Sequence, residues 1–567
     1  MSLLGTIQMA ANSLRATDVG LQVVGQNIAN ANTAGYSQEV LQLSPGPTQQ
    51  SGGVLLGTGV AIDGVSAQID PYVEEQLRLA NGTASSYSTQ AGVYQQLESV
   101  MNELSSSGTD LTTSLTNFSS AIQNVLGSPQ SDSTRQLAVA SGQTLAQNIN
   151  SLATQVQSMQ TDLNSQISGD VSSINQLVNQ IAQLNVQIAG LQAGVNNGST
   201  AVGLVDQRNQ ALGNLSNLVG ITVQQQPDGE VNVYAGNEYL VSGGIAQQVS
   251  LNDTIAPGAY GPTLQITANG SPLSTAGGQY GGQIAARDQI LGGFLNQLNS
   301  FSGTLAGAFN QIYASGQGLT GYSTVTSQYG VSSAGTPLEN AGLTTAPTNG
   351  SFQIVTENSV TGQSQTTTIN VSLEGLGNDT TLDDVANQIN QISGLSASVS
   401  ASGKLTIAST DANQTFSFAN DSSGLLTSLG INTFFTGDSA TTLGVNSDLV
   451  ADPSKFAAST GGVGQDTNNA QALSQFATAP LASQQGSTIT DLANGIVTNV
   501  TEGSASATAS STSSGSLQAS LQSQSQSVSG VSIDEQAVDM IQLQNTYLAS
   551  AKLITTIASL LQTLTQL

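Results

Sequence analysis

Hydrophobic residues recur with heptad spacing near both ends of the chain. Each pattern predicts an amphipathic helix with a narrow hydrophobic seam. Two helices packed on a globular core would show the same spacing, but their position at the two ends favours a shared helical stem. The seam positions, of which only Thr17, Gln536 and Ser550 are polar, are Leu3, Ile7, Ala10, Leu14, Thr17, Leu21, Val24 and Ile28, and then Ile533, Gln536, Met540, Leu543, Tyr547, Ser550, Ile554, Ile557, Leu561 and Leu564.

The hydrophobic period changes after residue 35. Short runs broken by glycine predict strands and hairpins up to Asp70. Asp70 and Pro71 then have the order of a helix N-cap followed by proline at the first helical position, which predicts a helix over 71–104. A much longer helix is predicted over 133–195, where apolar residues keep a regular seam.

The middle of the chain alternates between strand and helix signals. An Asp-Gly dipeptide between alternating residues predicts a hairpin, so residues 221–280 are expected to form a small β insertion. Helical spacing returns over 284–313, and residues 350–435 are typical of strands, one helix and further strands. A helix is predicted to resume at 466, whereas the sequence leaves the order of the Ser-rich stretch 503–527 open.

Helices therefore open and close the chain, and β-rich segments lie between them. Insertion of outer domains into a helical stem would give this layout, and the two ends would then meet in space. The predicted fold class is a multidomain α+β protein with a discontinuous α-helical coiled-coil stem built from both chain termini and inserted β-rich outer domains. The expected parts are a terminal coiled-coil inner domain with a β-hairpin segment (1–60 plus 527–567), a long-helix stem domain (61–220 plus 281–325 plus 461–526), a small β insertion (221–280) and a β-rich outer domain (335–450).

Charge narrows the range of partners. The chain has 567 residues, of which 35 are acidic and 8 are basic, so its formal net charge is −27. Nucleic acids and anionic membrane surfaces are both bound through clustered Lys and Arg, which this chain lacks. No apolar run reaches the roughly 18 residues of a membrane span. We therefore expect no nucleic-acid partner and no membrane insertion.

Residue types also restrict catalysis. The chain has no Cys and no His, which excludes disulfides, the usual zinc sites and nucleophiles activated by histidine, and we expect no metal and no cofactor. An enzyme would have to use paired carboxylates, as a glycoside hydrolase acting on cell wall does. The candidate pairs Glu74/Glu75 and Asp383/Asp384 each lie just inside a predicted helix start, where acids favour the helix dipole. A structural role explains them better, so no enzymatic activity is predicted.

A further alternative is an adhesin or glycan-binding surface protein. In that case the Thr- and Ser-rich face of residues 335–450 would bind the ligand. Solvent-facing sides of antiparallel sheets commonly have the same composition. Binding to a glycan array would test this alternative, and hydrolysis of cell wall by the purified protein would test the enzymatic one.

Three asparagines end the predicted N-terminal helix. Asn27, Asn30 and Asn32 are followed by Gly35 and Tyr36. Asparagine is a poor helix former but a good cap and turn former, and glycine can adopt the left-handed conformation that ends a helix. We expect this stretch to stop the helix and to direct the chain into a strand. The residues alone leave open whether it also contacts a neighbouring subunit.

Several motifs together resemble one protein family. They are "NIANANTAGYS" from Asn27, "LVDQRNQALGNLSNLVGI" (204–221), "DTNNAQAL" (466–473) and "SVSGVSIDEQAVDMIQLQNTYLASAKLI" (527–554). The first is similar to the bacterial flagellar rod, hook and hook-associated axial proteins in general. The "DQRN" and "SGVSIDE" segments favour the FlgK-type hook-associated proteins, which join hook to filament. Ala34 and Gln38 stand where the family commonly has proline and a basic residue. The sequence therefore does not determine which contacts this motif makes.

The resemblance implies a structural, non-enzymatic role at the hook–filament junction of the bacterial flagellum, outside the cell. It implies secretion by the flagellar type III apparatus with help from an export chaperone, and assembly with copies of itself, the hook protein and the next junction protein or flagellin. The N-terminal stretch lacks a basic region and a continuous apolar core, so no Sec signal peptide is predicted. Another axial protein of the hook or rod type is the alternative. The assembly interface is expected to comprise Leu3, Ile7, Leu14, Leu21, Val24, Asn27, Ile28, Asn30, Asn32, Gly35, Tyr36, Met540, Leu543, Tyr547, Ile554, Ile557, Leu561 and Leu564.

Overall fold

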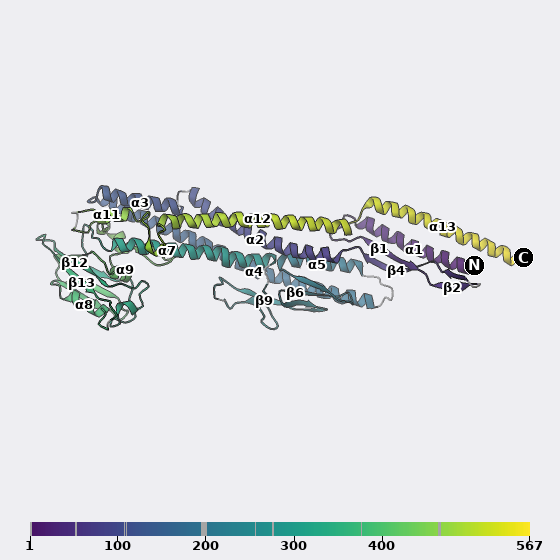
Figure 1. The fold of residues 1–567 in the computed structure, drawn as a ribbon, viewed down its shortest axis with the longest axis horizontal. Coiled ribbons are helices and arrows are strands. Elements are labelled where there is room, and N and C mark those ends of the chain that lie inside the picture. Colours follow the sequence, from purple (N-terminus) through teal and green to yellow (C-terminus); the bar gives the residue numbers. More distant parts are fainter. Residues whose placement is uncertain are drawn as a thin grey trace. The chain divides into compact units, whose positions relative to one another are not determined.

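The chain is a multidomain α+β protein that separates into two compact units. Its computed structural model describes residues 3–51, 54–106, 108, 110–193, 201–255, 257–274, 277–375, 377–462 and 466–566. Figure 1 shows the elements coloured along the chain. Each unit combines segments that are distant in sequence: the first contains 1–94, 160–290 and 504–567, and the second contains 95–159 and 291–503. The finer division into four domains stays a prediction.

The helices of the first unit include both terminal ones. Asp70 caps α2 as predicted, because its carboxylate accepts the backbone N–H groups of Tyr72 (2.9 Å) and Val73 (3.3 Å). Three of the helices, α2, α4 and α12, continue into the second unit. The helices are α1 (Leu3–Asn30), α2 (Pro71–Ser106), α4 (Asp132–Ala193), α5 (Val202–Leu218), α6 (Gly278–Ala285) with the π-helical turn Ala286–Leu291, α12 (Ile489–Ser529) and α13 (Ile533–Gln566).

The strands of the first unit form antiparallel sheets. Two hairpin-like pairs follow α1: β1 (Glu39–Pro45) pairs with β4 (Val60–Ala67), and β2 (Thr48–Ser51) pairs with β3 (Val54–Gly57). The strands expected within 221–280 are present, and the predicted turn lies at Gly229, whose φ is +84°. They are β5 (Thr222–Gln225), β6 (Val231–Ala235), β7 (Glu238–Ser242) and β8 (Ile245–Ala246) in one sheet, and β9 (Val249–Asn252) with β10 (Thr263–Ile266) in another.

One hydrophobic core joins these sheets to the long helices. Ile174, Val178 and Ile181 of α4 are fully buried, and so is Leu215 of α5. Alternate residues of β6 are buried in the same cluster, as expected for a strand with one face on the core. The seam predicted for the long helix is therefore the surface on which the small sheets pack.

The second unit has a helical part rich in phenylalanine. Its helices include α3 (Leu111–Gly127), α7 (Gly292–Tyr313) and α11 (Asn468–Ser474). Phe118 lies 5.1 Å from Phe309 and 5.3 Å from Phe434, measured between ring centroids. Offset and edge-to-face ring pairs of this kind add stability beyond the area that they bury. The cluster comprises Phe118, Phe309, Tyr313, Phe434, Phe435, Phe456 and Phe476.

The strands of the second unit form three small sheets around a separate core. The predicted order of strands, helix and strands within 350–435 is confirmed. Helix α8 begins with a capping box between Thr381 and Asp384. The elements are β11 (Thr324–Thr326), β12 (Gly350–Asn358), β13 (Ser364–Val371), α8 (Leu382–Asn390), β14 (Leu395–Val399), β15 (Leu405–Ser409), β16 (Gln414–Ala419), α9 (Leu425–Leu429), β17 (Phe435–Thr436), β18 (Gly444–Val445) and α10 (Ser447–Ala451), with 3-10 turns at Leu338–Asn340, Pro453–Lys455 and Ala482–Gln484.

Two local expectations were incomplete. The Ser-rich stretch 503–527, whose order the sequence left open, is helical as part of α12. The helix predicted to resume at 466 begins at Asn468 and stops at Ser474, and the chain then forms turns until Ile489. Pro480 lies in this break, where proline disfavours a continuous helix.

Candidate assembly surface

The corner after α1 is built around the side chain of Asn27. Its amide nitrogen donates to the backbone oxygen of Glu39 (2.9 Å) and to Oε1 of Gln536 (2.9 Å). Its amide oxygen accepts from the hydroxyl of Tyr36 (2.8 Å) and from the backbone N–H of Glu39 (2.9 Å). These four bonds use the full capacity of an amide. Asn27 is 1% exposed, so it connects α1, β1 and α13 within one chain.

The remaining residues of the corner turn the chain. Thr33 N–H donates to the oxygen of Asn30 (2.8 Å), and Tyr36 N–H donates to the oxygen of Thr33 (3.2 Å). Gly35 has a φ of +79°, the left-handed conformation predicted for it. Asn32 is exposed and Asn30 is partly exposed. Of the three asparagines, Asn27 therefore has an internal structural role, Asn30 is partly exposed and Asn32 lies on the surface, as does Gly35.

A carboxylate from the "DQRN" motif holds the far side of this corner. Oδ2 of Asp206 accepts the backbone N–H of Ser37 (3.1 Å), across 169 residues of sequence. Asp206 is 7% exposed, and burial raises its pKa. The pKa of Glu39 is raised mainly by burial and to a smaller extent by the charge of Asp206. The pKa of Tyr36 is also raised mainly by burial, with smaller contributions from the charges of Glu39 and Asp206. Two carboxylates and a phenol thus share a site in which ionisation is disfavoured.

The arginine of the same motif points to a different partner. Nη1 of Arg208 donates to the oxygen of Gly229 (2.6 Å) and to Oδ1 of Asn185 (3.1 Å). Arg208 is 3% exposed, and burial, followed by the charge of Arg78, lowers its pKa to about 10. Asp206 and Arg208 therefore fasten α5 to the corner and to the β5–β6 hairpin. The sequence could not predict either contact, because the motif identifies an aspartate and an arginine but not the residues that they bind.

Helices α1 and α13 pack against each other in an antiparallel register. The hydroxyls of Ser13 and Ser550 are 3.0 Å apart, and Asn27 bonds Gln536. Between these points, a Cβ atom added at Gly20 would lie 3.2 Å from Leu543. The three contacts advance by seven residues on each helix, which is the spacing of the predicted seams. The polar seam residues Gln536 and Ser550 thus have partners on α1, and Thr17 bonds the backbone of Ser13.

The predicted interface residues fall into two groups. One group faces the partner helix and is buried or partly buried, and the other group is exposed. The most deeply buried residues of the first group are Val24, Asn27 and Ile557. Tyr547 is exposed, as is Ile533 at the start of the seam. The side chains of Leu3 and Leu564 lie outside the described residues. The partly buried group comprises Ile7, Leu14, Leu21, Ile28, Asn30, Tyr36, Met540, Leu543, Ile554 and Leu561.

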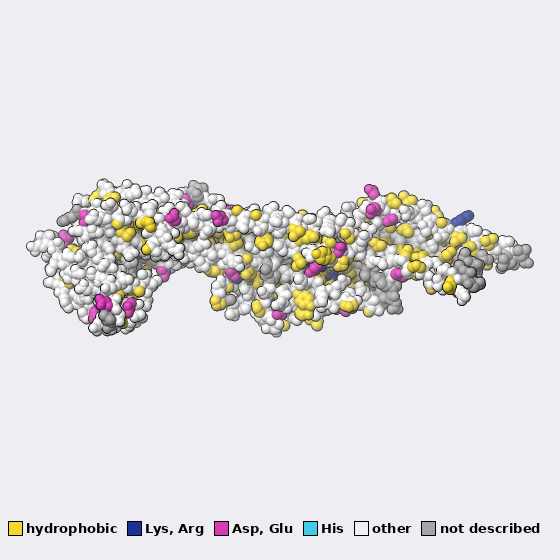
Figure 2. Space-filling view, viewed as in Figure 1, with side chains coloured by type: hydrophobic (Ala, Val, Ile, Leu, Met, Phe, Trp, Pro, Cys, Tyr) yellow, Lys and Arg dark blue, Asp and Glu magenta, His cyan; other side chains and the backbone are white. Residues whose placement is uncertain are grey.

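A second apolar face of α13 is open to solvent, and the predicted seams do not include it. Ile541 is 58% exposed and Leu548 is 65% exposed. Helical periodicity places these residues opposite the seam, since they are offset from Leu543 and Ser550 by about half a turn. Figure 2 shows hydrophobic side chains on the outer side of this helix. The exposed set is Val538, Ile541, Leu548, Leu553 and Leu560.

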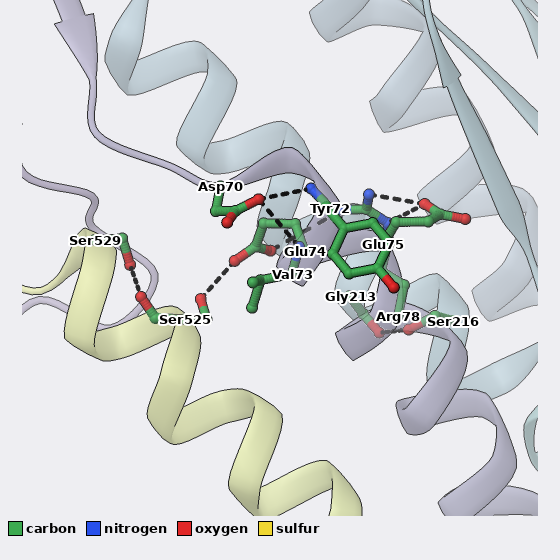
Figure 3. A network of polar contacts seen from close by, with 10 residues as sticks. All are labelled: Asp70, Tyr72, Val73, Glu74, Glu75, Arg78, Gly213, Ser216, Ser525 and Ser529. Atoms are coloured by element: carbon green, nitrogen blue, oxygen red, sulfur yellow. Dashed lines mark hydrogen bonds and ion pairs between the residues drawn. The ribbon is translucent and has the colours of Figure 1, made fainter.

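The carboxylate pairs considered for catalysis are engaged in structural contacts. Figure 3 shows Glu74 and Glu75 at the start of α2, with Glu74 directed toward α12 and Glu75 toward Arg78. Ser525 donates to Glu74 (2.5 Å), and Nη2 of Arg78 lies 2.9 Å from Glu75. In the other pair, Asp384 completes the capping box of α8 and Asp383 is exposed.

A polar groove of about 650 Å³ lies beside the corner in the first unit. Its walls come from the corner itself, α2, α5 and α12, and they carry many amide side chains. The lining includes Asn32, Arg78, Asn209, Gln210, Asn214, Gln518 and Gln522. Among the described residues no cluster of acidic side chains has the arrangement of a metal site, and no helix is long and apolar enough to cross a membrane.

Comparison with known proteins gives matches in two regions. Residues 94–327 match the flagellar hook-associated protein FlgK helical domain, and residues 522–567 match the C-terminal region of the flagellar basal body rod FlgEFG proteins. Flagellar hook-associated protein 1 of Salmonella typhimurium is 26% identical over 327 residues, covering 56% of this chain and 57% of that protein. The Escherichia coli protein of the same name is 25% identical over 318 residues, with coverages of 55% and 57%. The match therefore spans little more than half the length of these relatives.

A solved structure described as the flagellar hook junction protein FlgK from Burkholderia pseudomallei has a TM-score of 0.48 and 20% sequence identity, and it covers 80% of this chain and 100% of that one. The helical-domain model and the curated relatives are flagellar hook-associated proteins, and the C-terminal model is that of flagellar rod proteins, so the chain is similar to flagellar axial proteins in both regions. These matches support a FlgK-type hook-associated protein.

Proposed function

We propose that this chain is a structural, non-enzymatic axial protein of the bacterial flagellum that joins hook to filament. The matches to the FlgK helical domain and to hook-associated protein 1 support this role. The observation that carries it in the structure is the α1–α13 pair, whose inner seam is filled while an apolar face of α13 stays exposed. Large apolar side chains in a row on an acidic protein are typical of an interaction surface.

The proposal assigns the terminal pair to a coiled-coil stem at the axis of the flagellum. Copies of the chain would pack through the outer face of α13, with the β-rich segments 221–280 and 335–450 as parts inserted away from that stem. Hook protein on one side and the next junction protein or flagellin on the other are the partners in this arrangement. Among the residues predicted for the interface, the exposed Asn32, Gly35 and Tyr547 are accessible to such neighbours.

The proposal also includes the route to the assembly site. The chain would leave the cell through the flagellar type III apparatus, kept soluble by an export chaperone, without a Sec signal. Its presence in the culture medium should then depend on the export apparatus. Detection of equal secreted amounts in a strain without that apparatus would contradict this part of the proposal.

Electron microscopy of a strain that lacks the gene tests the function. We expect hooks without attached filaments, and filaments restored when the gene is supplied in trans.

A second experiment tests the exposed face: Leu548→Asp should lower the fraction of hooks that carry filaments by about tenfold or more. Ile245→Asp is the matched control, because Ile245 is 66% exposed but lies on strand β8. Normal filaments in the strain without the gene would contradict the proposed function.

A further inference from the structure

The polar groove beside the corner carries no net charge. Its lining of 24 residues includes two charged side chains, Glu74 and Arg78. Nη1 of Arg78 lies 4.0 Å from Oε2 of Glu74, and Nη2 of the same arginine lies 2.9 Å from Oε2 of Glu75. Figure 3 shows this wall of the groove, where Glu74 accepts a hydrogen bond from Ser525 of α12. Both charges are engaged by protein groups, so the groove suits a neutral ligand better than an ionic one.

Two rows of amide side chains line the groove from different helices. Gln210 and Asn214 are four residues apart on α5, and Gln522 and Gln526 are four residues apart on α12. Side chains at this spacing lie on one face of a helix, about 6 Å apart along its axis. The groove is therefore bounded by two helix faces that each repeat the same polar group.

These four amides have unused hydrogen-bonding capacity. Their side chains form no hydrogen bond with any residue that the structure describes. By contrast, Nε2 of Gln518, one turn before Gln522, donates to Oδ1 of Asn81 (2.8 Å) and so connects α12 to α2. Each unbonded amide offers two N–H donors and an oxygen acceptor. A ligand in the groove therefore meets donors and acceptors on both of its sides.

The balance of polar and apolar side chains decides the class of ligand. Nine of the 24 lining residues have amide side chains and five have hydroxyl groups. Protein and peptide partners bind mainly through large side chains that fill well-packed pockets. A sugar instead displays hydroxyl groups on every edge of its ring, and each of them needs a polar partner. The groove favours a sugar, because its apolar lining is limited to Ala31, Ala34, Ile69, Leu77 and Val531.

We infer that the polar groove binds a neutral oligosaccharide of N-acetylated hexosamine units. The acetamido group of such a sugar has one N–H donor and one carbonyl acceptor, and a single Asn or Gln side chain can pair with both. The groove volume of about 650 Å³ lies within the range of about 300–1,000 Å³ that is typical of ligand sites, and a trisaccharide is a ligand of this size. The inference goes beyond the proposed function, because the binding needs neither assembly nor another flagellar protein.

Isothermal titration calorimetry of the purified full-length protein with triacetylchitotriose tests the binding. We expect saturable binding with one site per chain, and weaker binding of maltotriose, which has no acetamido group. A tetrasaccharide of alternating N-acetylglucosamine and N-acetylmuramic acid represents bacterial cell wall, and its carboxylates should weaken binding further. The inference is overturned if triacetylchitotriose shows no saturable binding. It is also overturned if maltotriose, the cell-wall sugar or a neutral peptide of similar length binds as tightly.

Gly213 provides a way to fill the groove without disturbing its walls. It lines the groove on α5, and no atom lies within 4 Å of a Cβ atom added there. Gly213→Phe therefore places a ring in the open space of the groove and should weaken the binding of triacetylchitotriose more than about tenfold. Gly203→Phe is the matched control, because Gly203 lies on the same helix, has equally open surroundings and does not line the groove. Equal affinities of the two variants would overturn the location of the site.

Removal of one amide tests the contacts themselves. Gln522→Ala should weaken the binding of triacetylchitotriose about two- to tenfold, as expected for the loss of one neutral hydrogen bond. Gln524→Ala is the control, because Gln524 is exposed about half a turn away on the same helix and does not line the groove. Urea unfolding should show that both surface substitutions leave stability within about 0.5 kcal/mol of the parent. If the Gln522→Ala variant is folded and binds the sugar as tightly as the Gln524→Ala variant, the amide rows do not form the site.

Discussion

Asn27 makes four hydrogen bonds to three parts of its own chain, so its removal leaves several buried polar groups without partners. Asn27→Ala should lower the free energy of unfolding by about 3 kcal/mol, the upper end of the cost of unsatisfied buried groups. Urea unfolding of the purified protein measures this. Asn32→Ala, at an exposed position five residues further on, should change stability by less than about 0.5 kcal/mol. Similar values for the two variants would contradict the structural role of Asn27.

Gly35 tests the backbone of the corner. A Cβ atom there would make ordinary contacts with Gln210 at 3.7 Å, so the cost of substitution comes from the φ of +79° alone. Gly35→Val should destabilise the corner by about 1–2 kcal/mol, because a β-branched residue tolerates the left-handed region badly. Gly35→Asn should lose less, since asparagine visits that region more easily. Motility and urea unfolding equal to the parent in the valine variant would show that the conformation is not required.

Asp206 gives the corner a pH dependence. Because burial raises its pKa in the folded chain, its contribution to stability is present in full below the unfolded-state pKa of about 3.9 and is lost as the pH rises through the raised folded-state value. Asp206→Asn cannot ionise and can still accept the N–H of Ser37. Its stability relative to the parent should therefore increase between pH 3.5 and pH 7 in urea unfolding. A difference that is constant across this range would contradict the assignment.

The sequence predicts the backbone conformation of the corner better than it predicts the hydrogen-bond partners of the corner's side chains. Asparagines followed by glycine predict a helix stop, and the positive φ of Gly35 agrees with that. The bond between Asn27 and Gln536 spans 509 residues, and the bond between Ser37 and Asp206 spans 169. Local propensity contains no information about such distances, so the buried role of Asn27 and the raised pKa of Asp206 could not be derived from the pattern.

At the scale of elements, Gly20 of α1 faces Leu543 of α13. A larger side chain there meets Leu543, whereas at Gly25 of the same helix no atom lies within 4 Å of an added Cβ. Gly20→Leu should therefore destabilise the α1–α13 pair by about 1–3 kcal/mol through overpacking. Gly25→Leu should be neutral or slightly stabilising, because leucine is the better helix former. Hydrogen exchange of residues 533–566 measures the effect, and equal protection in the two variants would contradict the packing.

The elements themselves followed the hydrophobic period. The seams predicted α1 and α13, and the Asp70–Pro71 signal predicted α2, because capping and periodicity are local properties. The phenylalanine cluster could not be predicted, since Phe118, Phe309 and Phe476 come from separate helices and Phe434 from a loop within the expected β-rich domain. The exposed face of α13 was visible as extra apolar residues, but only the structure separates it from the covered seam.

At the scale of the whole molecule, the phenylalanine cluster decides how much of the outer β-rich part can be removed. Replacement of 335–450 by a Gly/Ser linker would delete Phe434 and Phe435 and should destabilise the second unit by more than about 3 kcal/mol. A shorter excision of 352–420 keeps both rings, and its ends are close because Ser422 and Ser351 share a backbone hydrogen bond of 2.9 Å. Filament attachment should survive the shorter excision if the terminal helices carry assembly. Loss of attachment by a stably folded short variant would contradict that arrangement.

The most direct test of the account is a map of the isolated hook–filament junction by electron cryo-microscopy. We predict that every copy of the chain keeps α1 and α13 paired in the register that joins Asn27 to Gln536, and that Leu548 is buried against a neighbouring copy. A junction in which the two helices separate, or in which Leu548 faces solvent while another part of the chain makes the contacts between copies, would contradict the central claim that the terminal helix pair is the assembly element.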